Sequence, residues 1–304
     1  MIIDLPDSTD FENAGLSLLN TSLDIVFNLL RDLDEAEYWG IDVEEEKDEY
    51  WRRSMPLLFN SFSVAQQAFE FILKSKICEI SPYLLISGGP KEWPRQSSQT
   101  DKKFSEFKTI DAHDLIQTIN TFSIPNKKIS STFEEKFNKF RNKRNIIQHS
   151  IDNNLNIEIK EILLYILELY TELFPSETIL KFRRKFIDLL PLHYLHSTDT
   201  KPFIIWEFSI LCKFLTPSET KKYLNFQKNQ RHYYCETCLN NMPDADNPIQ
   251  LSYLKPKSHV STNLYCFICD MNYPVLRQDC VSEECLGNVI YIDSKLCATC
   301  MNEN

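Results

Sequence analysis

The chain has 304 residues and a net charge of −10; 43% of its residues are hydrophobic, 12% are aromatic and only 5 are glycine. This length suggests two domains with a connector, and few glycines together with many aromatic residues favour long helices over glycine-punctuated strands. No apolar run reaches the roughly 18 residues of a membrane span and no signal peptide is recognisable, so we expect a cytoplasmic protein without membrane partners.

The negative charge is concentrated at the N-terminal end of the chain. Residues 1–50 hold 15 acidic and 2 basic side chains, which leaves the rest of the chain slightly basic. Charge blocks of this kind are usually solvated faces. An acidic arm that shields a basic site is the alternative interpretation.

Five helices are predicted before residue 175, because apolar side chains recur there at helical spacing. They span residues 14–37, 49–80, 110–121, 131 to about 152, and 157–173. The sequence therefore predicts that residues 1–175 form one all-α domain. Residues 176–228 continue with helical, aromatic-rich sequence that is either a connector or an extra packing layer.

Eight of the ten cysteines lie in four close pairs near the C-terminal end of the chain. The pairs are Cys235 with Cys238, Cys266 with Cys269, Cys280 with Cys285, and Cys297 with Cys300. Two cysteines a few residues apart can turn both thiolates toward one point, and zinc takes four ligands in a tetrahedron. Residues 229–304 are therefore predicted to hold two structural zinc ions in a module that resembles a double zinc ribbon with short β-hairpins. Four thiolates leave no open position for water, so we expect no catalytic metal.

Two other arrangements of these cysteines compete with this prediction. Four disulfides fit poorly, because thiols inside cells stay reduced and no export signal is present. A cross-braced arrangement would exchange cysteine pairs between the two ions. The segment 289–292 looks like a hairpin strand within a self-contained second ribbon, which favours sequential pairing. Cys78 and Cys212 stand alone in apolar sequence and are expected to be small core residues.

The predicted fourth helix is the best candidate for chemistry. Its apolar stripe consists of Phe133, Phe137 and Phe140. Arg144 occupies the next place on that stripe, where a guanidinium must be paired, reach an interface or line a pocket. Asn145 and His149 share one helix face. Five basic residues lie between positions 136 and 144, as phosphate binding requires.

The segment from Arg144 to His149 reads Arg-Asn-Ile-Ile-Gln-His and resembles the Arg-Asn-x-x-x-His motif of HEPN domains. The amphipathic second helix with Glu70 and Lys74, the start of the third helix at His113, and an Ile/Leu-rich helix after the motif are also similar to that family. The resemblance covers about residues 14–175. It implies a mainly α fold in which a HEPN-like helical bundle precedes the zinc-ribbon domain.

What the resemblance implies for function is a metal-independent endoribonuclease that acts on RNA as a homodimer, with two motifs meeting in one cleft. Arg144 would neutralise the scissile phosphate, His149 would transfer protons with the RNA 2′-hydroxyl, and Asn145 would orient the pair. Cleavage would leave a 2′,3′-cyclic phosphate. Many relatives are toxins or anti-phage defence effectors, so an antitoxin or regulatory protein is an expected partner. The zinc ribbons would bind substrate or partner.

One position departs from a subgroup of this family. Where the partner is a nucleotidyltransferase antitoxin, a tyrosine follows two residues after the histidine, but here that residue is Ile151. We therefore do not expect control by modification of such a tyrosine.

Other interpretations of the same residues stay open. Arg144 and His149 would then only tie their helix to its neighbours, and Glu70 is expected to be solvated or salt-bridged rather than a site acid. The alternative function is a non-catalytic RNA- or protein-binding adaptor. A third interpretation has the zinc ribbons bind DNA, although few basic and aromatic residues lie between the cysteine pairs.

Overall fold

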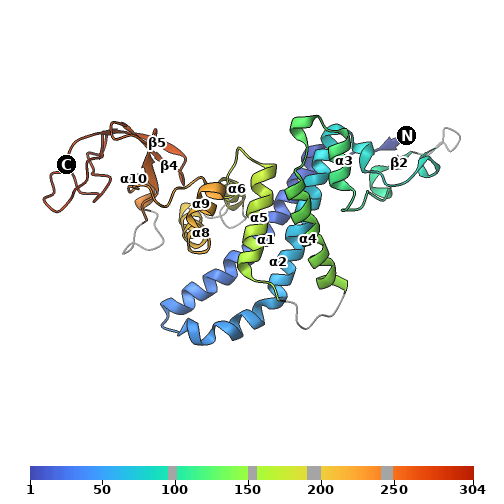
Figure 1. The fold of residues 1–304 in the computed structure, drawn as a ribbon, viewed down its shortest axis with the longest axis horizontal. Coiled ribbons are helices and arrows are strands. Elements are labelled where there is room, and N and C mark those ends of the chain that lie inside the picture. The colour runs from blue at the N-terminus through green and yellow to red at the C-terminus, as the bar shows by residue number, and fades with distance from the viewer. Residues whose placement is uncertain (95–100, 150–155, 190–199, 241–248) are drawn as a thin grey trace. The chain divides into compact units, whose positions relative to one another are not determined.

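The computed structural model describes residues 1–94, 101–149, 156–189, 200–240 and 249–304 of the chain (Figure 1). The protein is mainly helical and has a small antiparallel sheet toward its C-terminal end. It divides into two compact units, Met1–Leu173 and Phe174–Asn304. None of the described helices is long and apolar enough to cross a membrane.

The first unit is a helical bundle built around one central helix. Its helices are α1 (Ser8–Tyr38), α2 (Val43–Ile80), α3 (Leu115–Phe122), α4 (Ser131–His149) and α5 (Ile159–Leu173). Short 3-10 turns lie at Pro82–Leu85, Pro90–Glu92, Phe104–Glu106 and Pro125–Lys127, and β1 (Ile2–Ile3) pairs in parallel with β2 (Lys102–Lys103). The central helix is α2, which contacts each of the other four helices. All five helices that the apolar spacing predicts are therefore present.

Two of these helices begin earlier than the apolar spacing predicts. For α2 the reason is its cap, because the Asp42 side chain accepts hydrogen bonds from the backbone N–H groups of Glu44 and Glu45. Acidic side chains in a first turn also interact favourably with the positive end of the helix dipole. The acidic segment is thus exposed to solvent but helical, and it opens α2.

Close packing between α1 and α2 depends on Gly15. A Cβ atom at this position would lie 2.7 Å from Cγ1 of Ile72 and 2.9 Å from the carbonyl oxygen of Ala68. The two helices therefore approach each other more closely than a larger side chain at Gly15 would permit.

The apolar stripe predicted on α4 is buried. Phe133, Phe137 and Phe140 are 1%, 0% and 7% exposed. The Phe140 ring stacks on Phe62 of α2 and on Tyr165 of α5. This aromatic stack holds α4 against both neighbouring helices, and it fixes the direction in which the polar end of α4 projects.

The second unit combines short helices with a four-stranded antiparallel sheet. The helices are α6 (Ile179–Asp188), α8 (Lys201–Phe214), α9 (Pro217–Leu224) and α10 (Glu236–Leu239). The strands are β3 (Ser252–Leu254), β4 (Asn263–Cys266), β5 (Met271–Leu276) and β6 (Ile290–Tyr291), and they neighbour one another in that order.

The helices of the segment 176–228 pack against the turn between β4 and β5. Phe267 in that turn contacts the rings of Phe208 and Phe226, with ring centroids 4.6 and 4.9 Å away. Lys181 of α6 forms an ion pair with Asp270 at 2.8 Å. The segment therefore belongs to the same compact unit as the cysteine pairs.

A buried ion pair joins α6 to α8. The side chains of Arg183 and Glu207 are 3% and 1% exposed. Nε of Arg183 donates to Oε2 of Glu207 at 3.0 Å, and Nη2 donates to Oε1. With both charges paired and hydrogen-bonded, the pair can be accommodated in the interior.

Candidate functional site

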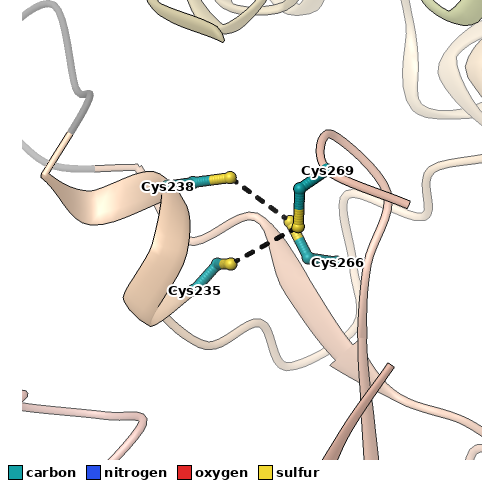
Figure 2. A group of neighbouring side chains, drawn as sticks. All are labelled: Cys235, Cys238, Cys266 and Cys269. Carbon is teal, nitrogen blue, oxygen red and sulfur yellow. Dashed lines mark hydrogen bonds between the residues drawn. The ribbon is translucent and has the colours of Figure 1, made fainter. Parts of the chain in front are cut away.

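The first two cysteine pairs come together in one buried cluster (Figure 2). Cys235 caps α10 and Cys238 lies within that helix, while Cys266 ends β4 and Cys269 lies in the following turn. The Sγ atoms of Cys235 and Cys269 are 3.8 Å apart, as are those of Cys238 and Cys266. Four thiolates bound tetrahedrally at about 2.3 Å from one zinc ion are about 3.8 Å apart. The cluster thus has the dimensions of a four-thiolate metal site.

The last two pairs form a second, more exposed cluster. Cys280 and Cys300 have Sγ atoms 3.7 Å apart, and those of Cys285 and Cys297 are 3.9 Å apart. All ten cysteines are free, and these distances far exceed the roughly 2.05 Å of a disulfide. The sequential grouping of the pairs is therefore confirmed over the cross-braced one, and each group could hold a metal ion.

Hydrogen-bond donors contact sulfur atoms in both clusters. In the first cluster, hydrogen bonds from neighbouring thiols, that of Cys238 first, lower the pKa of Cys235 to about 7, while the contact with Cys235 raises the pKa values of Cys238 and Cys266. In the second cluster the backbone N–H of Gly287 donates to Sγ of Cys285 at 3.3 Å, and that of Ser282 donates to Cys280 at 3.5 Å. Because metal ligation requires deprotonated cysteines, these contacts suit a cation.

The two clusters share one sheet and one core. The strand β6 bridges to Cys297 through Ile290, as a hairpin strand would, but it also pairs with β5 through Val275 and Tyr291. The core between the clusters consists of Tyr233, Leu264, Val275, Val289, Tyr291 and Ala298. The second ribbon is therefore not self-contained, because β6 completes the sheet that carries the first cluster.

Gly287→Ala should weaken metal binding by the second cluster. A Cβ atom at Gly287 would lie 2.8 Å from Sγ of Cys297 and 2.7 Å from Cβ of Thr299, so the alanine must displace a ligand. Overpacking of this kind costs about 1–3 kcal/mol, which corresponds to a loss of about 5- to 150-fold in affinity for the ion of the second cluster. Competition with a colorimetric chelator measures that affinity. Gly89→Ala is the matched control, since a Cβ there meets nothing within 4 Å. Equal affinities for both variants would contradict this role for Gly287.

On α4, the structure pairs Arg144 within the chain. Nη2 of Arg144 donates to Oε1 of Glu70 on α2 at 2.8 Å, and the two side chains are 21% and 17% exposed. Nη1 donates to Oδ1 of Asn145 and Oε1 of Gln148, both at 3.1 Å. Arg144 is thus paired, which is one of the three situations expected for it, and its partner Glu70 is salt-bridged. Asn145 therefore accepts a hydrogen bond from its neighbour Arg144.

His149 is the last residue of α4. Its side chain lies outside the described residues, as does the whole of Ile151. The structure therefore brings Arg144 and Asn145 together and leaves the geometry between Arg144 and His149 undescribed.

Lys74 adds a second basic group on the same helix as Glu70. Burial lowers the pKa of Lys74, and the negative charges of Glu70 and Asp111 partly oppose that shift. Its Nζ donates to Oγ1 of Thr109 at 3.0 Å. In the sequence, Lys74 stands out only as part of the resemblance. Its spacing of four residues from Glu70 was the signal that the two charges share a helix face.

Carboxylates offset much of the positive charge on α4. Lys136 forms an ion pair with Glu168 at 2.6 Å, and Lys143 forms one with Glu161 at 2.5 Å, both across to α5. Together with the pair between Arg144 and Glu70, three of the five basic residues between positions 136 and 144 have acidic partners. The segment is therefore less basic in the folded protein than in the sequence.

The arrangement offers two kinds of chemistry. Two groups of four thiols could each hold a metal ion, and a partly exposed guanidinium on α4 could contact an anion. Comparisons of this chain with protein families, with curated proteins and with solved structures found no match. The candidate sites are therefore defined by their geometry and by the sequence motif.

Proposed function

We propose that the protein is a metal-independent endoribonuclease of the HEPN type that acts as a toxin or anti-phage defence effector. The observation that carries this proposal is the position of Arg144. Its guanidinium is held near the C-terminal end of α4 by Glu70, Asn145 and Gln148, yet it is partly exposed. A fixed cation in the same motif as a histidine five residues later suits in-line attack on an RNA phosphate, which needs charge stabilisation and proton transfer.

In this mechanism each residue of the motif has one task. His149 takes the proton from the 2′-hydroxyl, whose oxygen attacks the adjacent phosphorus. The bond to the 5′-oxygen breaks, and that oxygen takes a proton from water. The products are a 2′,3′-cyclic phosphate and a 5′-hydroxyl. Arg144 stabilises the charge on the phosphate, and Asn145 orients Arg144. Imidazole suits this task because its unperturbed pKa lies near neutrality.

We assign two structural zinc ions to the cysteine clusters. Tetrahedral groups of four thiolates are typical of zinc, and such sites keep no open position for substrate or water. The metal-binding part would then stabilise the second unit and take part in binding substrate or partner.

A non-catalytic RNA- or protein-binding adaptor is the second candidate. The observation that favours it is the ion pair itself, because the Glu70 carboxylate already occupies one edge of the Arg144 guanidinium. A phosphate would have to displace Glu70 or share Arg144 with it. The ion pairs of Lys136 and Lys143 also favour the adaptor, because they offset positive charge on α4.

The test of the proposed activity is cleavage of RNA by the zinc-loaded chain without added divalent metal. A labelled single-stranded RNA should yield fragments that end in a 2′,3′-cyclic phosphate. This end group is identified by opening it with acid or with a phosphatase that accepts cyclic phosphates. RNA that stays intact with every sequence tested, with or without a candidate partner protein, would favour the adaptor instead.

We further expect a homodimer with α4 at the interface, because the proposed cleft needs two copies of the motif. Ile146 on α4 is an apolar side chain that is 43% exposed, so Ile146→Glu should shift the dimer toward monomer. Light scattering at micromolar concentration measures the mass. Leu189→Glu is the control, at an apolar residue of the second unit that is 77% exposed. A wild-type chain that is monomeric throughout would argue against a composite site.

A further inference from the structure

The second unit contains a basic pocket that the proposed catalytic role does not use. Its volume is about 600 Å³. The side chains that matter here are Arg231, Tyr253, Lys257, His259, Arg277 and Asn288. Among the described residues that line the pocket none is acidic, although the chain as a whole has a net charge of −10.

Arg277, which directly follows β5, has donors without acceptors. Its Nη2 donates to Oδ1 of Asn288 at 3.1 Å. Nε and Nη1 are shielded from solvent and have no hydrogen-bond partner within the described parts of the chain. Buried donors are normally satisfied, but Nε and Nη1 do not share an edge of the guanidinium: each forms a two-pronged pair only with Nη2, which already bonds to Asn288. Arg277 thus lines the pocket as a cation whose hydrogen bond is to an uncharged amide, and such a charge suits a bound anion.

Further cations are placed around the same pocket. Arg231 lies over the Tyr233 ring, with Cζ 5.4 Å from the ring centroid, and its Nη2 donates to the carbonyl oxygen of Leu286 at 3.3 Å. Lys257 and His259 are exposed. Several separated cations suit a chain of phosphates better than a single anion.

An aromatic side chain also lines the pocket. Tyr253 on β3 is half-buried, and its ring packs edge-on against Tyr265 on β4 with centroids 5.5 Å apart. A tyrosine ring fixed by its neighbour beside a cationic pocket is a surface on which a nucleobase can stack. An acidic peptide would use the cations but would leave this ring without a matching group.

We propose that this pocket binds a short stretch of single-stranded RNA. Arg277 holds one phosphate, Lys257 contacts a neighbouring phosphate, and Tyr253 stacks against a base. The inference rests on the proposed function in one respect, since it takes the strand to be the RNA that the site on α4 cuts. It gives the second unit the task of holding substrate.

The experiment measures RNA binding by the full, zinc-loaded chain carrying His149→Ala, so that the probe is not cut. Fluorescence anisotropy of a labelled single strand of about 12 nucleotides is followed over a range of salt concentrations. Arg277→Gln should weaken binding by about tenfold or more, because it removes the guanidinium charge from the pocket. Lys257→Gln should weaken it by a few-fold and reduce the slope of log affinity against log salt by about 0.7. Lys221→Gln, at an exposed position of α9, is the matched control and should change neither.

The two pocket variants together separate lost RNA binding from misfolding. Arg277→Gln also removes the hydrogen bond to Asn288, whereas Lys257 is exposed. If both variants keep the wild-type circular dichroism and metal content yet bind RNA as the control does, the proposal is overturned. It is equally overturned if a phosphorylated peptide fills the pocket and RNA does not. If RNA binds through the pocket but the wild-type chain never cuts it, the proposed function is contradicted and the pocket is not. If RNA is cut equally fast with and without Arg277 and Lys257, the pocket is contradicted and the proposed function is not.

Discussion

Removing metal should unfold the cysteine-rich part of the second unit while the helices of the first unit stay folded. The reason is the small size of the core between the clusters, which six buried residues form. Structural zinc binding contributes about 10–16 kcal/mol, which matches or exceeds the roughly 5–15 kcal/mol that stabilises a whole domain. The first unit contains neither cluster and has its own core around α2.

Metal analysis and spectroscopy together test this expectation. Protein purified without added zinc should contain about two zinc ions per chain. A strong chelator should then abolish the near-ultraviolet signal of the buried tyrosines Tyr233 and Tyr291 and leave most of the far-ultraviolet helix signal. Cys266→Ser should reduce the metal content, whereas Cys212→Ser, outside both clusters, should not. A folded chain with almost no metal would contradict the assignment.

The second large effect concerns the α4 motif. His149→Ala should slow RNA cleavage by about 10²–10⁴-fold, which is the usual loss when a positioned acid–base group is removed. Arg144→Ala should abolish measurable cleavage, because the phosphate charge is then unopposed. Arg144→Lys should be intermediate, since a lysine keeps the charge but not the two-pronged geometry. Asn145→Ala should be milder, because it orients and does not react.

Glu70 separates a catalytic from a structural role for Arg144. If Arg144 is catalytic, Glu70→Gln leaves the guanidinium free for phosphate, so cleavage is kept or rises while Arg144→Ala abolishes it. If Arg144 only joins α4 to α2, the two variants should lose similar stability in urea, and the double variant should lose no more than either. A variant lacking both Arg144 and His149 that cuts RNA as fast as wild type would end the nuclease proposal.

Periodicity and cysteine spacing predicted the parts of the fold that depend on local sequence. The Phe133 stripe, the five helices and the four close cysteine pairs follow from such patterns. The sequential grouping was favoured by the segment 289–292, and it is correct although that segment does not form a self-contained ribbon. The early start of α2 was missed, because residues 43–49 carry no apolar pattern and are helical through the Asp42 cap. Apolar periodicity detects burial, so it does not detect helical turns that lie mostly in solvent.

Long-range pairing could not be predicted from the chain. The five basic residues on α4 suggested a phosphate site, yet Glu161 and Glu168 on α5 reach across to Lys143 and Lys136. Helical spacing gives the face of a residue but not which helix that face meets. The basic pocket was hidden for the same reason, because its side chains are contributed by separate strands and loops.

The sheet that runs through both cysteine clusters links the two metals thermodynamically. Ordering of the first cluster fixes β4 and β5, and β5 positions β6, whose Ile290 bridges to Cys297. The first ion therefore reduces the ordering entropy that remains for the second, and by reciprocity the second tightens the hold on the first. Loading should be cooperative, so that chains carrying a single ion are scarce at every point of a zinc titration.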